Sequence, residues 1–397
     1  MFPDWIKEAS LTQVETLGLY IHVPFCRRAC HYCDFYFTPR ASLMEEYVWA
    51  LLQEIEAYAS ILGAYRIETV FFGGGTPSWL PPKLWERIFT RLSALPTFSP
   101  VEITIEANPE DIHPDNIRFW RSLGVTRVSV GIQSFSSEVL LSLGRFHDPE
   151  AAYRAVECLS EVDMPSWSAD LIFAVPGQTI ESFVQDVHSL LDRGIPHISL
   201  YGLTIEERTV LYKKLRLGRI SPVNEEIYAT AYLAAHQSLR NAGFIWYEIS
   251  NWAYPGHECL HNWRYWQRKP YIGLGPSAHS YLPEMRWANR RNLRAYMTDL
   301  TRAVYPVDFV EKLSTRDILA EIWLTQFRTR AGVAWSDLTT LDKNTIIRLQ
   351  NAVRQAEESG WIEQTAEGFC LSPQGALFSD KLAAEFSTII DSAGIYA

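Results

Sequence analysis

Short apolar runs rich in β-branched residues alternate with longer helical patterns over residues 17–202, and this alternation strongly constrains the fold. Segments between the runs, such as 43–62, carry apolar residues at helical spacing. Such alternation predicts parallel strands joined by right-handed crossovers. Six strand–helix units predict an α/β fold in the form of a partial (β/α)6 barrel, and periodicity alone leaves a doubly wound open sheet as the alternative. The expected strands are residues 17–25, 68–72, 101–106, 126–131, 167–173 and 197–201.

The pattern changes after Pro222, where we expect a helix over 225–242, a strand within 244–250 and then an aromatic, His-rich loop through residue 281. The run 303–309 resembles a domain boundary. Beyond it, helical stretches are followed by two short β-rich runs that flank a turn, and helices followed by a small hairpin are typical of a winged-helix-like domain. The expected units are a barrel over 1–222, an extension over 223–303 and a C-terminal winged-helix-like helical domain over 304–397.

Charge and hydropathy exclude several functional classes. The chain of 397 residues has a formal net charge of −10, and an acidic protein is poorly suited to non-specific nucleic-acid binding. No stretch approaches eighteen uninterrupted apolar residues, so no transmembrane segment is expected. The N-terminal residues lack the basic flank and apolar run of a signal peptide, which predicts a cytoplasmic protein.

Three of the six cysteines, Cys26, Cys30 and Cys33, fall within eight residues directly after the first expected strand. Three thiolates in one loop can hold three irons of a 4Fe–4S cube and leave the fourth iron open. Zinc is the alternative, although zinc sites usually present four ligands in two separated pairs, and His22 or His31 would have to complete the set. The spacing therefore predicts an iron–sulfur cluster.

Polar residues recur where successive expected strands end. Glu106 ends the third strand, Gln133 follows the fourth and Asp170 lies in the fifth. A glycine triplet, 73–75, follows the second strand, where a bare backbone can approach a ligand closely. Because barrel active sites form at the C-terminal ends of the strands, we expect these residues to share one rim.

The cysteine spacing, together with the segments YIHVPFC and GGGTPS, resembles the radical S-adenosylmethionine (SAM) superfamily. Further segments resemble the family that contains oxygen-independent coproporphyrinogen III oxidase and the HemW heme chaperones: EANPE, GIQSF, LGRFHD, DLIFAVPGQT, YEISN and HNWRYW. The resemblance covers nearly the whole chain. It implies a radical SAM barrel with SAM as the exchangeable fourth ligand of the cluster.

The resemblance also implies roles for residues at matching positions. Tyr20, Gly74 and Glu106 match residues that hold the cluster-bound SAM. The positions that match residues assigned to a second SAM are Tyr32, Gly75, Thr76, Gln133, Arg145 and Asp170. Chemically the set is suitable, because carboxylates accept hydrogen bonds from ribose hydroxyls and a guanidinium pairs with a methionine carboxylate.

Two departures separate this chain from the oxidases of the family. The oxidases carry a fourth cysteine where this chain has Phe35, and they have a longer segment before the cluster loop. In contrast, residues 261–266 fit the HNxxYW signature of the HemW branch. The resemblance therefore implies a protein that binds heme as cargo and passes it to an unidentified acceptor protein, with a one-electron donor for the cluster. Oxidative decarboxylation of coproporphyrinogen III is the alternative, and radical chemistry on another tetrapyrrole is a third.

The heme ligand is expected in or near that signature. His261 is the leading candidate, and His257, Cys259 and His279 are nearby alternatives, because a neutral imidazole or a thiolate can serve as an axial ligand. The alternative is structural: an aromatic His-Asn segment can simply pack a loop onto the barrel and satisfy its own hydrogen bonds.

Overall fold

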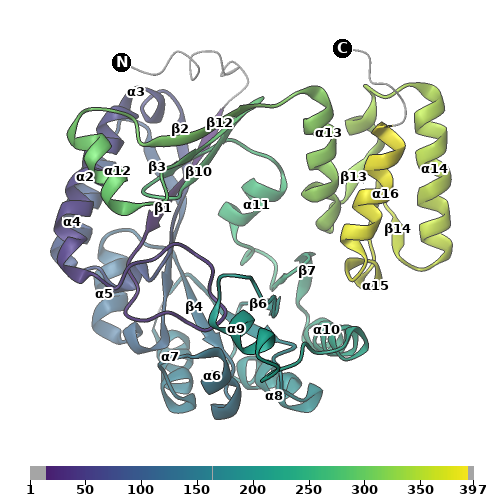
Figure 1. Ribbon diagram of the computed structural model, residues 1–397, viewed down its shortest axis with the longest axis horizontal. Helices are drawn as coiled ribbons and strands as arrows, with labels where there is room; N and C mark the ends of the chain where they lie inside the picture. The colour runs from purple at the N-terminus through teal and green to yellow at the C-terminus, as the bar shows by residue number, and fades with distance from the viewer. Residues whose placement is uncertain (1–14, 163, 392–397) are drawn as a thin grey trace.

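A single twelve-stranded sheet dominates the computed structural model, which describes residues 15–162 and 164–391 (Figure 1). The N-terminal residues on which the expectation about a signal peptide rests lie outside this range. The strand order is β12-β11-β10-β9-β1-β2-β3-β4-β5-β6-β8-β7. Because β1 to β6 are neighbours in chain order, with no reversal in the middle of the sheet, the doubly wound alternative is wrong and the partial barrel is confirmed.

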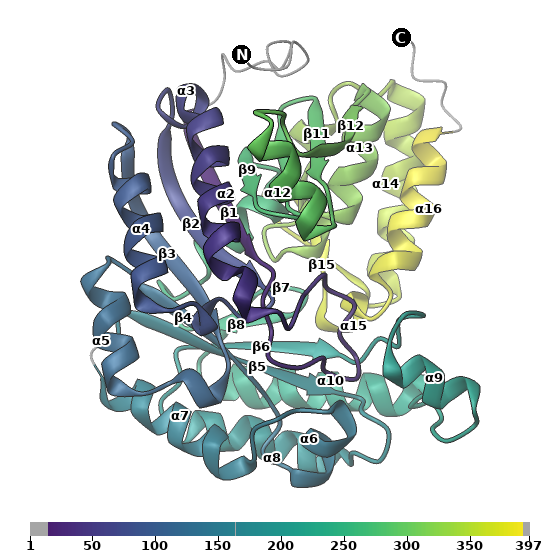
Figure 2. The same cartoon turned by 60° about the vertical axis from the view of Figure 1, so that its left-hand side comes forward.

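Six parallel strands form the barrel, each within a few residues of its predicted position. They are β1 (Thr16–Val23), β2 (Arg66–Gly74), β3 (Phe98–Ala107), β4 (Arg127–Gln133), β5 (Ser166–Phe173) and β6 (His197–Gly202). Most of their apolar residues are buried, because helices cover the outer face while the inner face lines the barrel. The loop after β1, seen in purple in Figures 1 and 2, runs across the end of the barrel.

Helices cover the outer face of the sheet along one continuous arc (Figure 2). Their apolar residues recur at helical spacing; in α4, for example, Trp85 and Phe89 pack on Phe72 of β2 with ring centroids 4.8 and 5.6 Å away. Several begin at a side-chain cap, such as Asp148 before α7 and Thr179 before α8. The helices are η2 (Ala41–Leu43), α2 (Met44–Ala57), α3 (Ala59–Leu62), η3 (Pro77–Trp79), α4 (Pro82–Ser93), η4 (Pro109–Asp111), α5 (Pro114–Ser122), α6 (Ser137–Leu143), α7 (Pro149–Glu161) and α8 (Ile180–Leu191).

The residues after β6 extend both edges of the sheet. At one edge β9 (Tyr271–Leu274) pairs parallel with β1, followed by antiparallel β10 (His279–Leu282), β11 (Met285–Asn289) and β12 (Val307–Lys312). At the other edge β8 (Asn251–Ala253) and β7 (Ile245–Glu248) follow β6. The strand expected within 244–250 is thus confirmed. The helices of this part are α9 (Val210–Arg216), α10 (Glu225–Asn241), α11 (Leu260–Trp266) and α12 (Leu293–Thr301).

One expectation for this region is wrong. Residues 251–281 were expected to form a loop, but they contain β8, α11, β9 and most of β10. Tertiary contacts outweigh local propensity here: Glu102 of β3 accepts hydrogen bonds from the backbone N–H groups of Leu260 and His261 at 2.9 Å each. A carboxylate at the first turn satisfies donors that a helix leaves free and complements its dipole.

The C-terminal part forms a small body beside the barrel, at the right of Figure 1. Its β14–β15 pair is the predicted hairpin, and Trp323, Phe327, Phe369 and Phe386 form its core. Backbone hydrogen bonds join it to β7, with Arg330 N–H donating to Tyr247 C=O at 2.9 Å. The elements are α13 (Thr315–Leu324), η5 (Gln326–Arg328), β13 (Val333–Ala334), η6 (Trp335–Leu338), α14 (Lys343–Glu358), β14 (Ile362–Gln364), β15 (Gly368–Leu371), α15 (Pro373–Ala376) and α16 (Ser379–Asp391).

The division of the chain after residues 222 and 303 stays a prediction. The strand β12, which lies after the second of these positions, pairs with β11 in the large sheet. Within the described residues, no helix has the length and apolar character needed to cross a membrane.

Candidate functional site

A cavity of about 730 Å³ opens where the barrel strands end. Its size is typical of a site for a cofactor or small ligand. One wall is the loop after β1, and the other walls come from the ends of β2 to β6. The predicted site residues that line it are Cys26, Cys30, Tyr32, Cys33, Gly74, Gly75, Thr76, Glu106, Gln133, Arg145 and Asp170. We call this space the outer cavity.

The three clustered cysteines lie half-buried on the loop side of the outer cavity. Thr76 Oγ1 donates to Cys26 Sγ and Arg145 Nη1 donates to Cys30 Sγ, each at 3.3 Å. Burial raises the pKa of the Cys33 thiol to about 11, so its thiolate form requires a bound cation. Among the described residues, no three His, Cys, Asp or Glu side chains converge on one metal ion. Three cysteines that do not converge on one metal ion suit a 4Fe–4S cube, in which each thiolate binds a different iron.

The glycine triplet brings bare backbone to the wall of the outer cavity. A Cβ on Gly75 would lie 2.6 Å from the carbonyl oxygen of Phe25, and one on Gly74 would lie 2.5 Å from the His22 ring. Gly74 also has a positive φ of 109°, which favours glycine. Its N–H donates to Glu106 Oε2 at 3.0 Å, which links the end of β2 to the end of β3.

Two carboxyl groups, Glu106 and Asp170, face the cavity from β3 and β5. Burial, together with the smaller effect of the nearby Asp170 charge, raises the pKa of Glu106 to about 7. Burial also raises the pKa of Asp170 to about 6, against hydrogen bonds from Ser199 and Ser129. Groups with such shifted pKa values in a cavity mark a candidate binding site.

Gln133, at the end of β4, and Arg145, which follows α6, lie beside Asn108. Arg145 Nη2 donates to Asn108 Oδ1 at 2.7 Å and to the Gly131 carbonyl at 2.8 Å, whereas its buried Nε has no partner among the described residues. Gln133 has a positive φ of 68° and a buried, unpartnered Oε1. A strained backbone and unpaired polar atoms are the features of a site prepared for a ligand.

Asn108 was missed in the sequence. It also donates to Thr76 Oγ1 at 3.3 Å, so it connects the residue beside Cys26 to the residue beside Cys30. The signal was available, because Asn108 directly follows the strand that ends in Glu106-Ala107, at the rim where the other polar residues were found.

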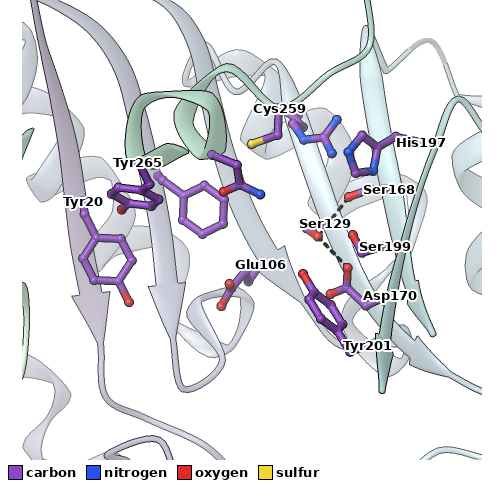
Figure 3. Close-up of a pocket in the computed structure, with 13 residues that line it drawn as sticks. Tyr20, Glu106, Ser129, Ser168, Asp170, His197, Ser199, Tyr201, Cys259 and Tyr265 are labelled. Atoms are coloured by element: carbon purple, nitrogen blue, oxygen red, sulfur yellow. Dashed lines mark hydrogen bonds between the residues drawn. The ribbon is translucent and has the colours of Figure 1, made fainter. Parts of the chain in front are cut away.

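A second, smaller cavity of about 200 Å³ lies deeper in the barrel (Figure 3). Four residues line both spaces and join them: Glu106, Ser129, Asp170 and Tyr201. We call the smaller space the inner cavity. Tyr20, expected beside the cluster-bound SAM, lines the inner cavity rather than the outer one, with its hydroxyl 3.1 Å from His22 Nδ1.

His261 is completely buried, and both of its ring nitrogens are used. Nδ1 lies 2.8 Å from Thr69 Oγ1, Nε2 lies 2.8 Å from the Tyr265 hydroxyl, and the ring stacks on Phe71. Burial lowers the pKa of His261 to about 3, so the imidazole is neutral. In this arrangement His261 holds α11 against β2, and binding to iron would require one of the two hydrogen bonds to break.

The other heme candidates occupy different places. Cys259 is buried at the start of α11, where its thiol donates to Glu102 at 3.6 Å, and burial raises its pKa to about 12. His257 is half-buried, with Nδ1 3.2 Å from Ser166 Oγ. His279 is exposed on β10, in the antiparallel extension beyond β1, and its ring has no hydrogen bond within the described residues. The structure therefore does not gather the four into one ligand set.

Comparison with known proteins defines the class. Residues 20–190 match the Radical SAM superfamily, which carries a 4Fe–4S cluster and SAM. The chain is 34% identical to the heme chaperone HemW of Mycobacterium tuberculosis, over 93% of this chain and 94% of that protein. It is 32% identical to the heme chaperone HemW of Escherichia coli K12, over 94% and 98%. The chain belongs to the HemW family.

The fold also matches a solved structure, coproporphyrinogen III oxidase (HemN) from Escherichia coli. The TM-score is 0.83, and the match covers 98% of this chain and 94% of that one. At 19% identity this likeness shows the fold alone. It includes nearly all of the chain, so the barrel, its extension and the C-terminal body are all parts of the shared architecture.

Proposed function

We propose that this protein is a heme chaperone, which binds heme and transfers it to an acceptor protein while carrying a 4Fe–4S cluster and SAM. The observation that carries the proposal is the likeness to curated heme chaperones over more than nine-tenths of both chains. The acceptor protein and the one-electron donor to the cluster belong to the proposal without being identified. The six cysteines are free thiols, which supports a reducing, cytoplasmic location.

We assign the cluster to Cys26, Cys30 and Cys33, and SAM to the outer cavity. When bound, the cluster can supply one electron to SAM. The chain itself supplies donors to the cysteine sulfurs through Thr76 and Arg145. Gly74 and Gly75 place backbone without side chains at the cavity wall, and Glu106 and Asp170 offer acceptors for hydroxyl or amino groups. The unpartnered Gln133 Oε1 and Arg145 Nε fit the same assignment.

For the heme iron we assign His279 as the ligand to test first. Its exposed ring can coordinate iron without breaking an internal hydrogen bond, unlike that of His261. Tyr281 on the same strand and Tyr271 on β9 lie with ring centroids 6.4 Å apart, and Arg268 lies 5.4 Å from the Tyr281 ring. Aromatic rings suit the face of a macrocycle, and a guanidinium suits its carboxylates.

Phe35 argues against the oxidase alternative. This residue stands where the oxidases of the family carry a fourth cysteine, and its side chain is 70% exposed at the wall of the outer cavity. A phenyl ring cannot supply a thiol there.

The proposal is tested by titrating the anaerobically reconstituted protein with heme and then adding an excess of apomyoglobin as a heme trap. We expect one heme per chain, followed by its transfer to the trap. The same preparation, supplied with reductant, SAM and coproporphyrinogen III, should release no carbon dioxide. Sustained carbon dioxide release with protoporphyrinogen formation, or failure to bind heme, would contradict the proposal.

The heme ligand is tested in parallel with His279→Ala and His261→Ala, using His188→Ala on the exposed face of α8 as the matched control. We expect His279→Ala to shift the Soret band and weaken heme binding at least about tenfold, because an iron–nitrogen bond is lost. A Soret shift in His261→Ala with none in His279→Ala would return the ligand to the HNxxYW segment.

A further inference from the structure

The deep end of the inner cavity is formed by residues that start strands rather than end them. Arg127 is the first residue of β4 and His197 the first residue of β6, and Cys259 precedes α11. All three line the inner cavity together with Ser168 and Ser199. Figure 3 labels His197, Cys259 and the two serines. Most of the residues assigned above to SAM lie at the other ends of the strands, whereas Glu106 and Asp170 also line the inner cavity.

Arg127 is a buried cation without a carboxylate partner. Only 3% of the residue is exposed, and its Nη1 donates to two neutral acceptors, Ser166 Oγ at 3.1 Å and the His257 carbonyl at 3.3 Å. Within the part of the chain that the structure describes, both hydrogen bonds of the guanidinium use Nη1 and the buried Nε has no partner. The free edge of the guanidinium is therefore the Nε–Nη2 fork, the edge that can pair with a carboxylate through two parallel hydrogen bonds.

His197 adds a further free donor. Its Nε2 lies 2.8 Å from the Tyr247 hydroxyl, which also accepts from the backbone N–H of Cys259 at 3.4 Å. The hydroxyl has one proton and, among the described residues, no acceptor other than the imidazole, so it donates to Nε2. A neutral imidazole that accepts at Nε2 carries its proton on Nδ1. That buried Nδ1 has no hydrogen-bond partner among the described residues.

The charges of Glu102 and Asp170 both raise the pKa of Arg127, but neither carboxylate accepts a hydrogen bond from it in the described structure. Glu102 accepts from the backbone N–H groups of Leu260 and His261 and from the Cys259 thiol, and it makes no ion pair with Arg127 in the described structure. The inner cavity's own carboxyl groups, Glu106 and Asp170, lie toward its junction with the outer cavity, which both of them also line. A buried cation with unpaired donors is costly unless an anion completes it.

We propose that the deep end of the inner cavity is a carboxylate subsite, in which the Arg127 fork and His197 Nδ1–H bind a short aliphatic carboxylate. A volume of about 200 Å³ admits a group of the size of propionate but not a macrocycle. The carboxylate is either a free short-chain acid or the propionate arm of a tetrapyrrole that enters from the outer cavity. The second source rests on the proposed heme function, whereas the subsite itself does not.

The subsite is tested by calorimetric titration of the anaerobically reconstituted, full-length protein with sodium propionate and with propionamide, its neutral counterpart. We expect binding of propionate only. Arg127→Met should weaken it at least about tenfold, since a charge-assisted pair is lost. Arg118→Met, at an exposed ion pair on α5, should leave it unchanged. Ser168→Val narrows the cavity while keeping Arg127, so it tests the subsite independently if Arg127→Met does not fold.

A second experiment identifies the source of the carboxylate by comparing the binding of heme with that of heme dimethyl ester. If Arg127→Met binds heme more weakly, and if the unsubstituted protein binds heme dimethyl ester more weakly by the same factor, the subsite holds a tetrapyrrole propionate. Unchanged heme binding beside lost propionate binding would assign it to a free acid. A protein that binds propionate but no heme would support the subsite and refute the proposed function. Equal binding of propionate and propionamide, or full propionate binding in both Arg127→Met and Ser168→Val, would overturn the subsite.

Discussion

Glu106 and Asp170 are the carboxyl groups that connect the two cavities, and they determine how the site responds to ligand and to pH. Each is held by a specific contact: Glu106 by the Gly74 N–H at 3.0 Å, and Asp170 by the Ser129 hydroxyl at 3.5 Å. Both are desolvated, and neither has a cation as a hydrogen-bond partner in the described structure. A ligand that donates hydrogen bonds to them therefore gains more than it would at the surface.

We predict that Glu106→Ala and Asp170→Ala each weaken SAM binding while iron content stays unchanged. Loss of a hydrogen bond to a charged group should cost roughly 1.5–3 kcal/mol, which is about tenfold or more in affinity. The measurement is an anaerobic SAM titration of the reconstituted variants, with the exposed Glu181→Ala as control. Wild-type affinity in both variants would show that these carboxyl groups serve the structure alone.

The same two residues predict how stability depends on pH. The pKa of Glu106 is about 7 and that of Asp170 about 6, both raised by burial above their values in an unfolded chain. Between about pH 4 and pH 7 the folded, ligand-free protein therefore holds protons that the unfolded chain has lost. The free energy of unfolding is largest below this window and falls as pH rises through it.

For Glu106 alone the decrease is on the order of 3 kcal/mol at most, since one pKa unit corresponds to about 1.4 kcal/mol. Urea denaturation of cluster-free protein at pH 5, 6 and 7.5 measures it. Glu106→Gln, which cannot ionise, should flatten the dependence. An identical slope in wild type and Glu106→Gln would show that the Glu106 pKa is not raised in the folded protein.

At the scale of elements, α11 is the unit that closes the deep side of the barrel. Its first turn binds Glu102 of β3 and its His261 binds Thr69 of β2. The fully buried Arg264 donates to the Thr16 and Pro270 carbonyl oxygens at 2.8 and 2.9 Å and pairs with Glu68. The HNxxYW segment therefore connects β1, β2 and β3, independently of any ligand that it binds.

We predict that His261→Ala lowers the free energy of unfolding by about 2–4 kcal/mol. The substitution removes a buried ring stacked on Phe71 and leaves the Thr69 and Tyr265 hydroxyls without their partner. Urea denaturation of heme-free protein measures the effect. His188→Ala, at an exposed position, should change stability by less than about 0.5 kcal/mol. Equal stability of the two variants would mean that His261 does not anchor α11.

The sequence predicted the elements whose pattern is local and missed those that depend on distant partners. The six barrel strands and the C-terminal hairpin follow from runs of apolar and β-branched residues, so their positions could be predicted. Residues 260–266 are rich in His, Trp, Tyr and Asn, which are mediocre helix formers, and their helix depends on Glu102, more than 150 residues earlier. No local pattern contains that information.

At the scale of the whole molecule, residues from all six barrel strands, the loop after β1 and α11 line two connected cavities. The cysteines, the glycine triplet and the rim carboxyl groups could be predicted, because each lies in a recognisable segment or at a strand end. The contacts of Asn108 with Thr76 and Arg145 and the positive φ of Gln133 could be found only in the structure. Arg127 and His197 begin two different strands and lie seventy residues apart in the sequence. No sequence motif predicts that they line the same cavity.

One measurement tests most directly whether a cluster and SAM share the outer cavity. It is the electron paramagnetic resonance spectrum of the anaerobically reconstituted, reduced protein before and after addition of saturating SAM. We predict about four iron and four sulfide per chain, and a spectrum that changes on addition of SAM because the iron without a cysteine ligand binds it. Cys30→Ser should keep the fold and lose the signal. A reduced-cluster spectrum that saturating SAM leaves unchanged, or a Cys30→Ser variant that retains the full cluster, would contradict the shared site.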